Sequence, residues 1–174
     1  QFRDRRKMIA FRGGYHGRTY GANSVTGLRP YDRQHPDSVP GTIFCRWGDL
    51  RQIRDVLGGD VAGVIVEPVQ LLQGGRTANS EFLVELEQLC RARAGALIVD
   101  ETRGGPARCG ATLASVLQGV QPHIVTLGPS IASGIPCGAL LIDRGMSEII
   151  VGPELDAASA GGPFVSAVCE ATLR

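Results

Sequence analysis

The sequence predicts an α/β domain with a mainly parallel sheet, and three observations support this prediction. Several short apolar runs end at turn-forming or charged residues, as the buried strands of parallel sheets do. Helical patterns lie between these runs, so strands and helices alternate along the chain. The 174 residues are 43% hydrophobic and 20% charged, which is the composition of an ordinary globular protein. We therefore expect one domain with one core over residues 1–174.

Six strands are expected, each of them a short apolar run that a turn or a charged residue follows. In chain order they are Met8–Phe11, Thr42–Arg46, Val61–Val66, Ala96–Val99, Ile124–Thr126 and Ala139–Ile142. Glycine clusters connect these elements, and no internal repeat or low-complexity linker divides the chain. The pattern therefore indicates connections within one domain.

Three helices are expected beside these strands. Leu50–Leu57 is a short one. Over residues 80–94 apolar residues recur at spacings of three and four, with Ser80 placed to cap the N-terminus and Gly95 placed to end the helix. The last helix, Pro163–Leu173, begins with a proline, whose missing N–H costs nothing at an early helical position.

Charge and hydropathy exclude several function classes. Eighteen basic and seventeen acidic residues give a formal net charge of +1, so no strong field favours nucleic acid or an acidic membrane. The single basic cluster, residues 3–7, lacks interleaved aromatics and is better explained as a solvated strand entrance. No run approaches the roughly 20 apolar residues of a membrane span, and the N-terminus lacks a signal-peptide pattern. We expect a soluble cytoplasmic protein that binds neither nucleic acid nor membrane.

The cysteines and histidines do not form a metal-binding pattern. The cysteines are widely spaced, with no CxxC pair and no neighbouring histidine at metal-ligand spacing. We expect no metal site, and we expect reduced, mostly buried thiols at Cys45, Cys90, Cys109, Cys137 and Cys169. The dispersed histidines are more simply explained as structural or surface residues; they are His16, His35 and His123.

Two acidic residues lie at the carboxyl ends of predicted strands. Glu67 follows Val61–Val66, and Asp100 follows Ala96–Val99. Ligands of open α/β sheets bind beyond these strand ends, so a shared pocket is one hypothesis. A strand-end carboxylate is explained equally well as a helix cap or as part of a hydrogen-bonded turn. Spacing alone leaves both alternatives open.

Longer motifs narrow this choice. In chain order they are Gly-Tyr-His-Gly-Arg-Thr at 14–19, Val-Ile-Val-Glu-Pro-Val-Gln at 64–70 with Gly-Gly at 74–75, Glu-Phe-Leu at 81–83, Leu-Ile-Val-Asp-Glu at 97–101, Arg-Cys-Gly at 108–110, Pro-His-Ile-Val-Thr-Leu-Gly at 122–128 and Gly-Ile-Pro-Cys-Gly-Ala at 134–139. Their order and spacing resemble the class III aminotransferases of the ornithine, acetylornithine and glutamate-1-semialdehyde type, which hold pyridoxal phosphate (PLP) as a Schiff base on a lysine. The resemblance implies a three-layer α/β sandwich like the large domain of fold-type I PLP enzymes, with the family's N-terminal segment and small C-terminal domain absent. We expect a homodimer, because a domain without these segments exposes surface that they would have covered.

The resemblance assigns roles to individual residues. Tyr15 matches the aromatic residue that stacks on the cofactor ring, and His16 lies beside it. Asp100 matches the carboxylate that keeps the pyridine nitrogen protonated. Thr102 matches a valine that packs on the other face of the ring, and Ser159 matches a threonine that reaches the phosphate of the neighbouring subunit.

Glu67 matches the glutamate of a Glu-Pro motif on the substrate side of the family's site. Two positions depart from the family. Pro129 stands where the Schiff-base lysine follows Thr-Leu-Gly, and Lys7 is the only lysine of the sequence. Arg103 stands where a glutamine contacts the phenolic oxygen of the cofactor. The proline side chain has no primary amine, so ordinary Schiff-base transamination is not expected. Any PLP or pyridoxamine phosphate (PMP) would bind noncovalently.

Asp100 raises a question of charge. A buried carboxylate without the pyridinium either finds a cation or becomes protonated, because an unpaired buried charge is costly. Arg103 and Arg108 are the cations nearest in sequence, and we expect one of them to occupy the space of the pyridinium beside Asp100.

Three function classes follow from these observations. The first is an enzyme without PLP that converts a small metabolite by acid–base or cyclisation chemistry, with Asp100, Glu67, His16 or Tyr15 in the pocket. The second is a noncatalytic homologue that binds a partner subunit. The third is an incomplete aminotransferase that binds PLP or PMP without a covalent bond. Fold resemblance alone does not choose a reaction among them.

Overall fold

Six strands of a mixed sheet organise the chain in the order β2-β1-β3-β6-β7-β8. The computed structural model describes residues 4–28, 39–93, 95–147 and 161–174. The strands are β1 (Lys7–Phe11), β2 (Thr42–Cys45), β3 (Val61–Val66), β6 (Ala96–Asp100), β7 (Ile124–Leu127) and β8 (Ala139–Ile142). All neighbouring pairs are parallel except β7 and β8, which run antiparallel. The α/β class and the mainly parallel sheet are thereby confirmed.

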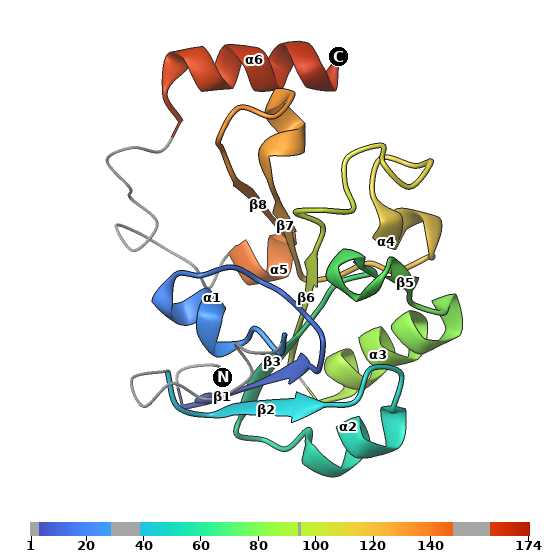
Figure 1. The fold of residues 1–174 in the computed structure, drawn as a ribbon. Coiled ribbons are helices and arrows are strands. Elements are labelled where there is room, and N and C mark those ends of the chain that lie inside the picture. Colours follow the sequence, from blue (N-terminus) through green and yellow to red (C-terminus); the bar gives the residue numbers. More distant parts are fainter. Residues whose placement is uncertain (1–3, 29–38, 94, 148–160) are drawn as a thin grey trace.

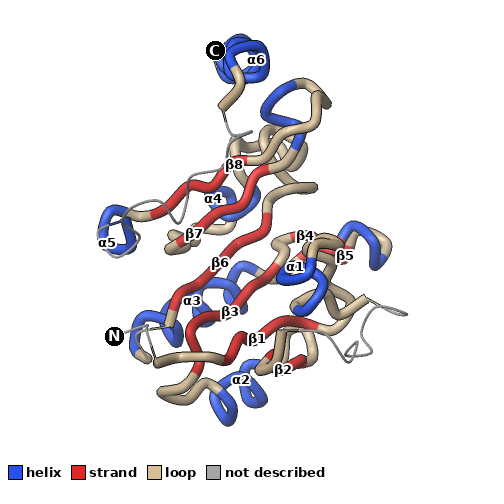
Figure 2. The backbone as a smooth tube through the Cα atoms, turned by 90° about the vertical axis from the view of Figure 1, so that its left-hand side faces the viewer, coloured by secondary structure: helices blue, strands red, loops and turns tan. Residues whose placement is uncertain are grey.

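Helices lie on both sides of this sheet. Figures 1 and 2 show α3 (Ser80–Ala92) and α4 (Ala114–Leu117) on one side, and α1 (Tyr20–Ser24) and α5 (Arg144–Ser147) on the other. The main core forms where α2 (Leu50–Val56) and α3 pack on the sheet. Fully buried Ile53, Leu83 and Leu86 contribute the helical side of this core, and Ile9, Val64 and Leu97 contribute the strand side. Parallel strands covered on both faces are apolar along their whole length, which explains the sequence pattern.

We call β2, β1, β3 and β6, together with α2 and α3, the central region. The edge region consists of β8, the 3-10 helix η2 (Pro129–Ala132) and α6 (Pro163–Leu173). α6 lies against η2 at the top of Figure 1, away from α2 and α3. Large apolar side chains are exposed in the edge region: Leu140 by 54%, Leu141 by 48% and Phe164 by 69%. This region therefore has little core of its own.

A small hairpin stands beside the central region. β4 (Val69–Gln70) and β5 (Arg76–Thr77) pair antiparallel around the 3-10 helix η1 (Leu71–Gln73). The guanidinium of Arg76 lies 4.2 Å from the ring centroid of Trp47, which is partly buried and packs against the main core. A cation over an indole face is a favourable contact, so it joins the hairpin to the segment after β2.

The predicted strands and helices are all present, with boundaries that differ by at most two residues. Two expectations are wrong. Asn79, not Ser80, caps α3, because the Asn79 side chain accepts from the backbone N–H of Glu81 at 2.8 Å. The cysteines are not mostly buried: Cys45 and Cys90 are buried, but Cys109, Cys137 and Cys169 are partly exposed.

Candidate active site

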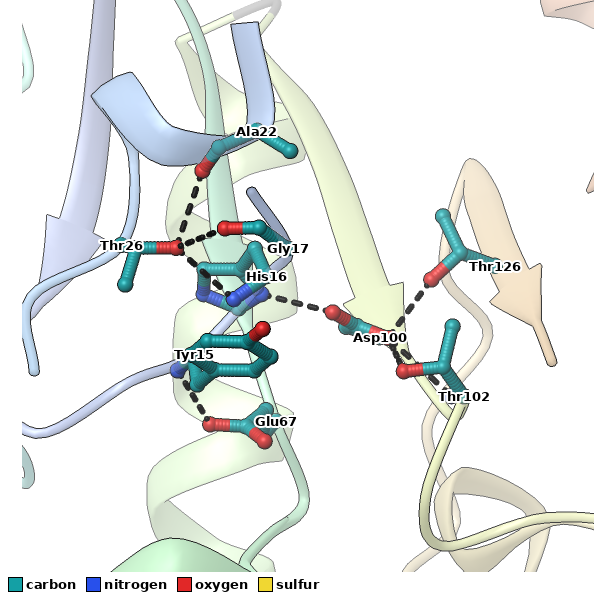
Figure 3. A network of polar contacts seen from close by, with 9 residues as sticks. All are labelled: Tyr15, His16, Gly17, Ala22, Thr26, Glu67, Asp100, Thr102 and Thr126. Carbon is teal, nitrogen blue, oxygen red and sulfur yellow. Dashed lines mark hydrogen bonds and ion pairs between the residues drawn. The ribbon is translucent and has the colours of Figure 1, made fainter. Parts of the chain in front are cut away.

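Three strand ends bring the candidate groups together. The loop after β1 carries Tyr15 and His16, β3 is followed by Glu67, and β6 ends at Asp100. Because these three strands are neighbours and parallel, their carboxyl ends meet at one edge of the sheet. Figure 3 shows the four side chains in one group. Glu67 and Asp100 therefore lie at the same end of the sheet, and a pocket shared by the two stays a prediction.

A buried hydrogen bond joins His16 to Asp100. The Nδ1 atom of His16 lies 2.7 Å from Oδ2 of Asp100, and each side chain is only 3% exposed (Figure 3). The carboxylate accepts at this distance only if Nδ1 carries the proton. The contact therefore fixes the ring orientation and leaves Nε2 as the ring nitrogen that does not face Asp100.

The other oxygen of Asp100 is also occupied. Oδ1 accepts from the Thr102 backbone N–H at 3.0 Å, the Thr102 hydroxyl at 2.6 Å and the Thr126 hydroxyl at 2.8 Å. Burial alone would raise the pKa of Asp100, but the hydrogen bond and charge of His16, followed by the Thr102 hydrogen bonds, lower the pKa below its ordinary value. Asp100 is therefore held ionised at neutral pH.

The expectation that an arginine pairs with Asp100 is wrong. We expected Arg103 or Arg108, yet within the described part of the chain the ionic partner of Asp100 is His16. The guanidinium of Arg103 instead lies 4.7 Å from the centroid of the Tyr15 ring. His16 comes from a loop far away in sequence, so proximity along the chain could not identify it.

Glu67 is the second buried carboxyl group, and it is 4% exposed. Its Oε2 accepts from the Tyr15 backbone N–H at 2.9 Å (Figure 3). Burial, the largest cause, raises the pKa of Glu67 to about 7, and the Asp100 charge adds to this rise. The Tyr15 hydrogen bond and the charges of His16 and Arg103 oppose it. Glu67 consequently changes protonation state near neutral pH, and its charge is coupled to those of the neighbouring groups.

The Thr26 side chain holds the loop that carries His16. The His16 N–H donates to the Thr26 hydroxyl at 3.0 Å, and that hydroxyl donates to the Ala22 carbonyl at 3.0 Å. A side chain at Gly14 would place its Cβ 3.2 Å from Nε2 of His16 and 3.0 Å from the Phe11 carbonyl oxygen. Glycine at this position therefore leaves room for the imidazole.

A cleft of about 530 Å³ adjoins this group of residues. Its walls include the cations Arg103 and Arg108 and the hydroxyls of Thr102, Ser130 and Ser133. Pro129, the first residue of η2, also lines the cleft. Arg103 connects the cleft to the buried carboxyl groups, because it contacts Tyr15 and its charge lowers the pKa of Glu67.

The only lysine of the sequence lies at the amino-terminal end of β1, and the candidate groups lie beyond its carboxyl end. Lys7 is the first residue of β1, and its Nζ atom forms an ion pair with Asp60 at 2.6 Å. The loop with Tyr15 and His16 follows the opposite end of the same strand, which spans five residues. At about 3.3 Å per residue, the length of the strand separates the Lys7 backbone from that end.

Sequence reasoning placed part of this group and missed the rest. It selected Tyr15, His16, Glu67 and Asp100, which lie together, and Thr102, which bonds Asp100. Ser159 lies outside the described residues. Thr26 and Thr126 were missed, although a hydroxyl at the end of a strand beside Asp100 was a usable signal for Thr126.

Comparisons with known proteins identify the family. The model of the class III aminotransferases matches residues 1–174. The acetylornithine aminotransferase of Methanopyrus kandleri is 36% identical over 166 residues, which cover 95% of this chain and 43% of that protein. The acetylornithine aminotransferase of Aquifex aeolicus is 32% identical over 78% of this chain and 36% of its own length. The chain therefore belongs to the class III aminotransferase family, and it spans about two fifths of the length of these relatives.

Solved structures agree with this assignment. The ornithine aminotransferase of Toxoplasma gondii, whose structure reveals partial occupancy of PLP at the active site, superposes with a TM-score of 0.85 at 29% identity. The match covers 98% of this chain and 40% of that one. The N-acetylornithine aminotransferase of Stenotrophomonas maltophilia gives a TM-score of 0.73 at 29% identity, over 99% of this chain and 39% of its own. The fold is that of the fold-type I PLP aminotransferases, as the motifs implied.

Two absences apply to the described residues alone. None of the helices in these ranges is long and apolar enough to span a membrane. No group of three or more histidine, cysteine, aspartate or glutamate side chains in the same ranges is arranged to hold a metal ion.

Proposed function

We propose that this chain works without a Schiff base: it binds a small anionic metabolite in the cleft beside Arg103 and transfers protons with Glu67 and His16. The observation that carries this proposal is the electrostatic coupling of a carboxyl group that titrates near neutral pH with a buried His16–Asp100 pair. Such a combination is typical of acid–base sites, in which neighbouring groups are held at different pKa values. It belongs to a single edge of the sheet, as ligand sites of this architecture do.

A Schiff base to PLP needs the primary amine of a lysine beside the cofactor. In the motif resemblance Pro129 stands where the family has its lysine, and Lys7, the only lysine of the sequence, pairs with Asp60 at the opposite end of β1. A Schiff base requires a neutral primary amine at the carbonyl carbon of the cofactor, and arginine does not substitute for it. The residues of this chain do not fit a covalently held PLP, so we derive no step through that group.

The residues that line the cleft indicate the class of ligand. Arg103 and Arg108 are two cations on the wall of the cleft, and three hydroxyl groups accompany them. A planar guanidinium binds carboxylate or phosphate through two parallel hydrogen bonds. The volume of about 530 Å³ lies within the range of small-molecule sites. We infer a ligand of metabolite size that carries at least one carboxylate or phosphate.

Glu67 and His16 are the two groups that can transfer protons in this proposal. With a pKa of about 7, Glu67 is present in both protonation states at neutral pH, so it can serve as a general acid or a general base. Asp100 stays ionised and orients His16 through Nδ1, which leaves Nε2 to accept or donate a proton. In this proposal Glu67 and His16 are the proton-transfer groups, and Asp100 is a positioning residue.

One observation favours a second candidate, noncovalent binding of PLP or PMP. Asp100 is held ionised at the end of β6, as a pyridinium nitrogen would require. Arg103 is the obstacle to this candidate, because its guanidinium lies 4.7 Å from the centroid of the Tyr15 ring, on which a cofactor ring would stack. In this candidate Arg103 leaves the Tyr15 face when the cofactor binds.

We also propose that the chain forms a homodimer. The exposed Leu140, Leu141 and Phe164 of the edge region supply apolar surface that a second copy would cover. Light scattering on a size-exclusion column tests this proposal. A dimer that Leu141→Asp converts to a monomer supports it, whereas a monomer at every concentration contradicts it. A heteromeric partner, the noncatalytic alternative, would then be the better explanation of this surface.

The test of the ligand site is calorimetric titration of the purified chain with PLP, PMP and a series of small mono- and dicarboxylates. Arg103→Ala should abolish carboxylate binding, and Arg54→Ala, which changes an exposed arginine of α2, is its matched control. Asp100→Ala should abolish binding of PMP if the second candidate holds, with Asp55→Ala as the control. Binding of PLP or PMP without any carboxylate binding would contradict the first proposal. Lack of binding by every ligand would contradict both.

A further inference from the structure

The structure brings two cysteines to one interface in the edge region. Cys137 lies in the segment between η2 and β8, and Cys169 lies in α6. Both side chains line one hollow of about 580 Å³, together with Ile131, Val165 and Leu173. Both cysteines are partly exposed, in contrast to the buried Cys45 and Cys90. These two thiols are therefore open to small reagents, and they face the same space.

The orientation of α6 explains why Cys169 faces Cys137. Val165, Cys169 and Thr172 follow each other at spacings of four and three residues, so they lie on one face of the helix. Val165 lines the same hollow. The Thr172 hydroxyl lies 3.0 Å from the Ser133 hydroxyl, at the end of η2. Contacts on both sides of Cys169 thus hold this face of α6 against the segment that carries Cys137.

We propose that Cys137 and Cys169 form a redox-active pair that a low-molecular-weight disulfide converts to an intramolecular disulfide, which fastens α6 to the segment before β8. One protein thiolate attacks the small disulfide, so that one S–S bond breaks, one mixed disulfide forms and one small thiol leaves. The second protein thiolate attacks the mixed disulfide and releases the second small thiol. Two protein thiols are oxidised, one small disulfide is reduced to two thiols, and the protons leave with these thiols.

The other cysteines are chemically different. Burial raises the pKa of Cys45 to about 11 and that of Cys90 to about 12, so these thiols stay protonated and unreactive in the folded chain. The Cys109 thiol contacts the Gly104 carbonyl at 3.4 Å, in a different loop. At Cys137 a loss of hydration, followed by the charge and hydrogen bonding of the Cys169 thiol, raises the pKa. The contributions of Cys169 to this shift follow from the closeness of the two thiols that the shared hollow already shows.

Peptide mapping tests the pair directly. The folded chain is incubated with oxidised glutathione, free thiols are alkylated, and the chain is digested with trypsin without reduction. Cleavage after Arg108 and Arg144 yields peptides 109–144 and 145–174, and the second contains Cys169 as its only cysteine. We expect these peptides to be joined by a disulfide in the unchanged chain and in Cys109→Ser, but not in Cys137→Ser or Cys169→Ser.

Two outcomes would overturn the proposal. In one, the joined peptides disappear in Cys109→Ser, which would assign the bond to Cys109. In the other, Cys137 and Cys169 carry only glutathione, which would show that their geometry does not allow closure. A second measurement checks the consequence for the fold. Oxidation should raise the midpoint of thermal unfolding, a reducing agent should reverse the shift, and Cys169→Ser should show no shift.

Discussion

The central region and the edge region of this chain are built from the same sheet but are stabilised differently. Ile9, Val64 and Leu97 of the central strands are fully buried beneath α2 and α3, whereas Leu140 and Leu141 of β8 are about half exposed. The buried carboxyl groups lie at the ends of the well-packed strands, and the neighbouring cleft extends from Thr102 and Arg103 to η2. The comparison teaches that the candidate acid–base groups rest on a core of their own, while the opposite wall of the cleft depends on weaker contacts.

The largest expected effect separates the two regions by their cores. Leu97→Ala should lower the free energy of unfolding by about 3 kcal/mol, because it opens a cavity beneath α3. At a concentration at which the chain is monomeric, Leu141→Ala removes a half-exposed side chain and should cost about 0.5 kcal/mol or less. Urea denaturation followed by circular dichroism measures both. Similar losses for the two variants in the monomer would show that Leu141 is buried within the chain itself, and the contrast between the regions would then be wrong.

The next effect is a pH dependence that should arise in the central region. The pKa of Glu67 rises from 4.5 to about 7 on folding, so its contribution to stability is complete below pH 4.5 and is lost as the pH rises through 7. Glu67→Gln replaces the carboxyl group with an amide, which does not ionise. Above pH 7 this variant should be more stable than the unchanged chain by roughly 3 kcal/mol, at 1.36 kcal/mol per pKa unit. Denaturation curves across this pH range measure the difference.

The matched control for this experiment is Glu170→Gln, which changes an exposed carboxylate of α6 in the edge region. Its pH profile of stability should follow that of the unchanged chain. If Glu67→Gln also followed that profile, the carboxyl group would be better hydrated than its 4% exposure indicates, and its assignment as a proton-transfer group would fail.

The smallest expected effect on stability is the loss of a single hydroxyl hydrogen bond, which can be compared between the two regions. Thr126→Val removes the bond to Oδ1 of the buried Asp100 and should cost about 1 kcal/mol, and Thr126→Ser should restore most of this loss. Thr172→Val removes the exposed contact with Ser133 in the edge region and should cost less, because water replaces the lost partner. Equal losses in the denaturation midpoints would contradict the difference in burial between the two sites.

Much of the fold could be predicted because the central strands are continuous apolar runs and α3 repeats its apolar residues over several turns. The elements that the sequence analysis missed are short. α1, α4 and α5 have four or five residues each, and β4 and β5 have two, which is too few for a hydrophobic period to be visible. The cap at Asn79 was missed because both Asn79 and Ser80 are capping residues, and periodicity does not choose between them.

The candidate site could be predicted where strand ends define it. Glu67 and Asp100 follow from the rule that ligands bind at the carboxyl ends of parallel strands. The partner of Asp100 could not be predicted in this way, because His16 reaches it from a loop 84 residues earlier. The proximity of Cys137 to Cys169 likewise depends on the docking of α6 against η2. Long-range contacts of this kind require the packed structure.

The contact between Trp47 and Arg76 has a practical consequence for experiments on this chain. Trp47 is the only tryptophan, and it packs against the core of the central region under the Arg76 guanidinium. Its emission therefore reports on α2, β2 and the β4–β5 hairpin, but not on α6. A release of α6 from η2 would leave the tryptophan spectrum unchanged, so fluorescence and backbone signals should separate whenever the edge region opens first.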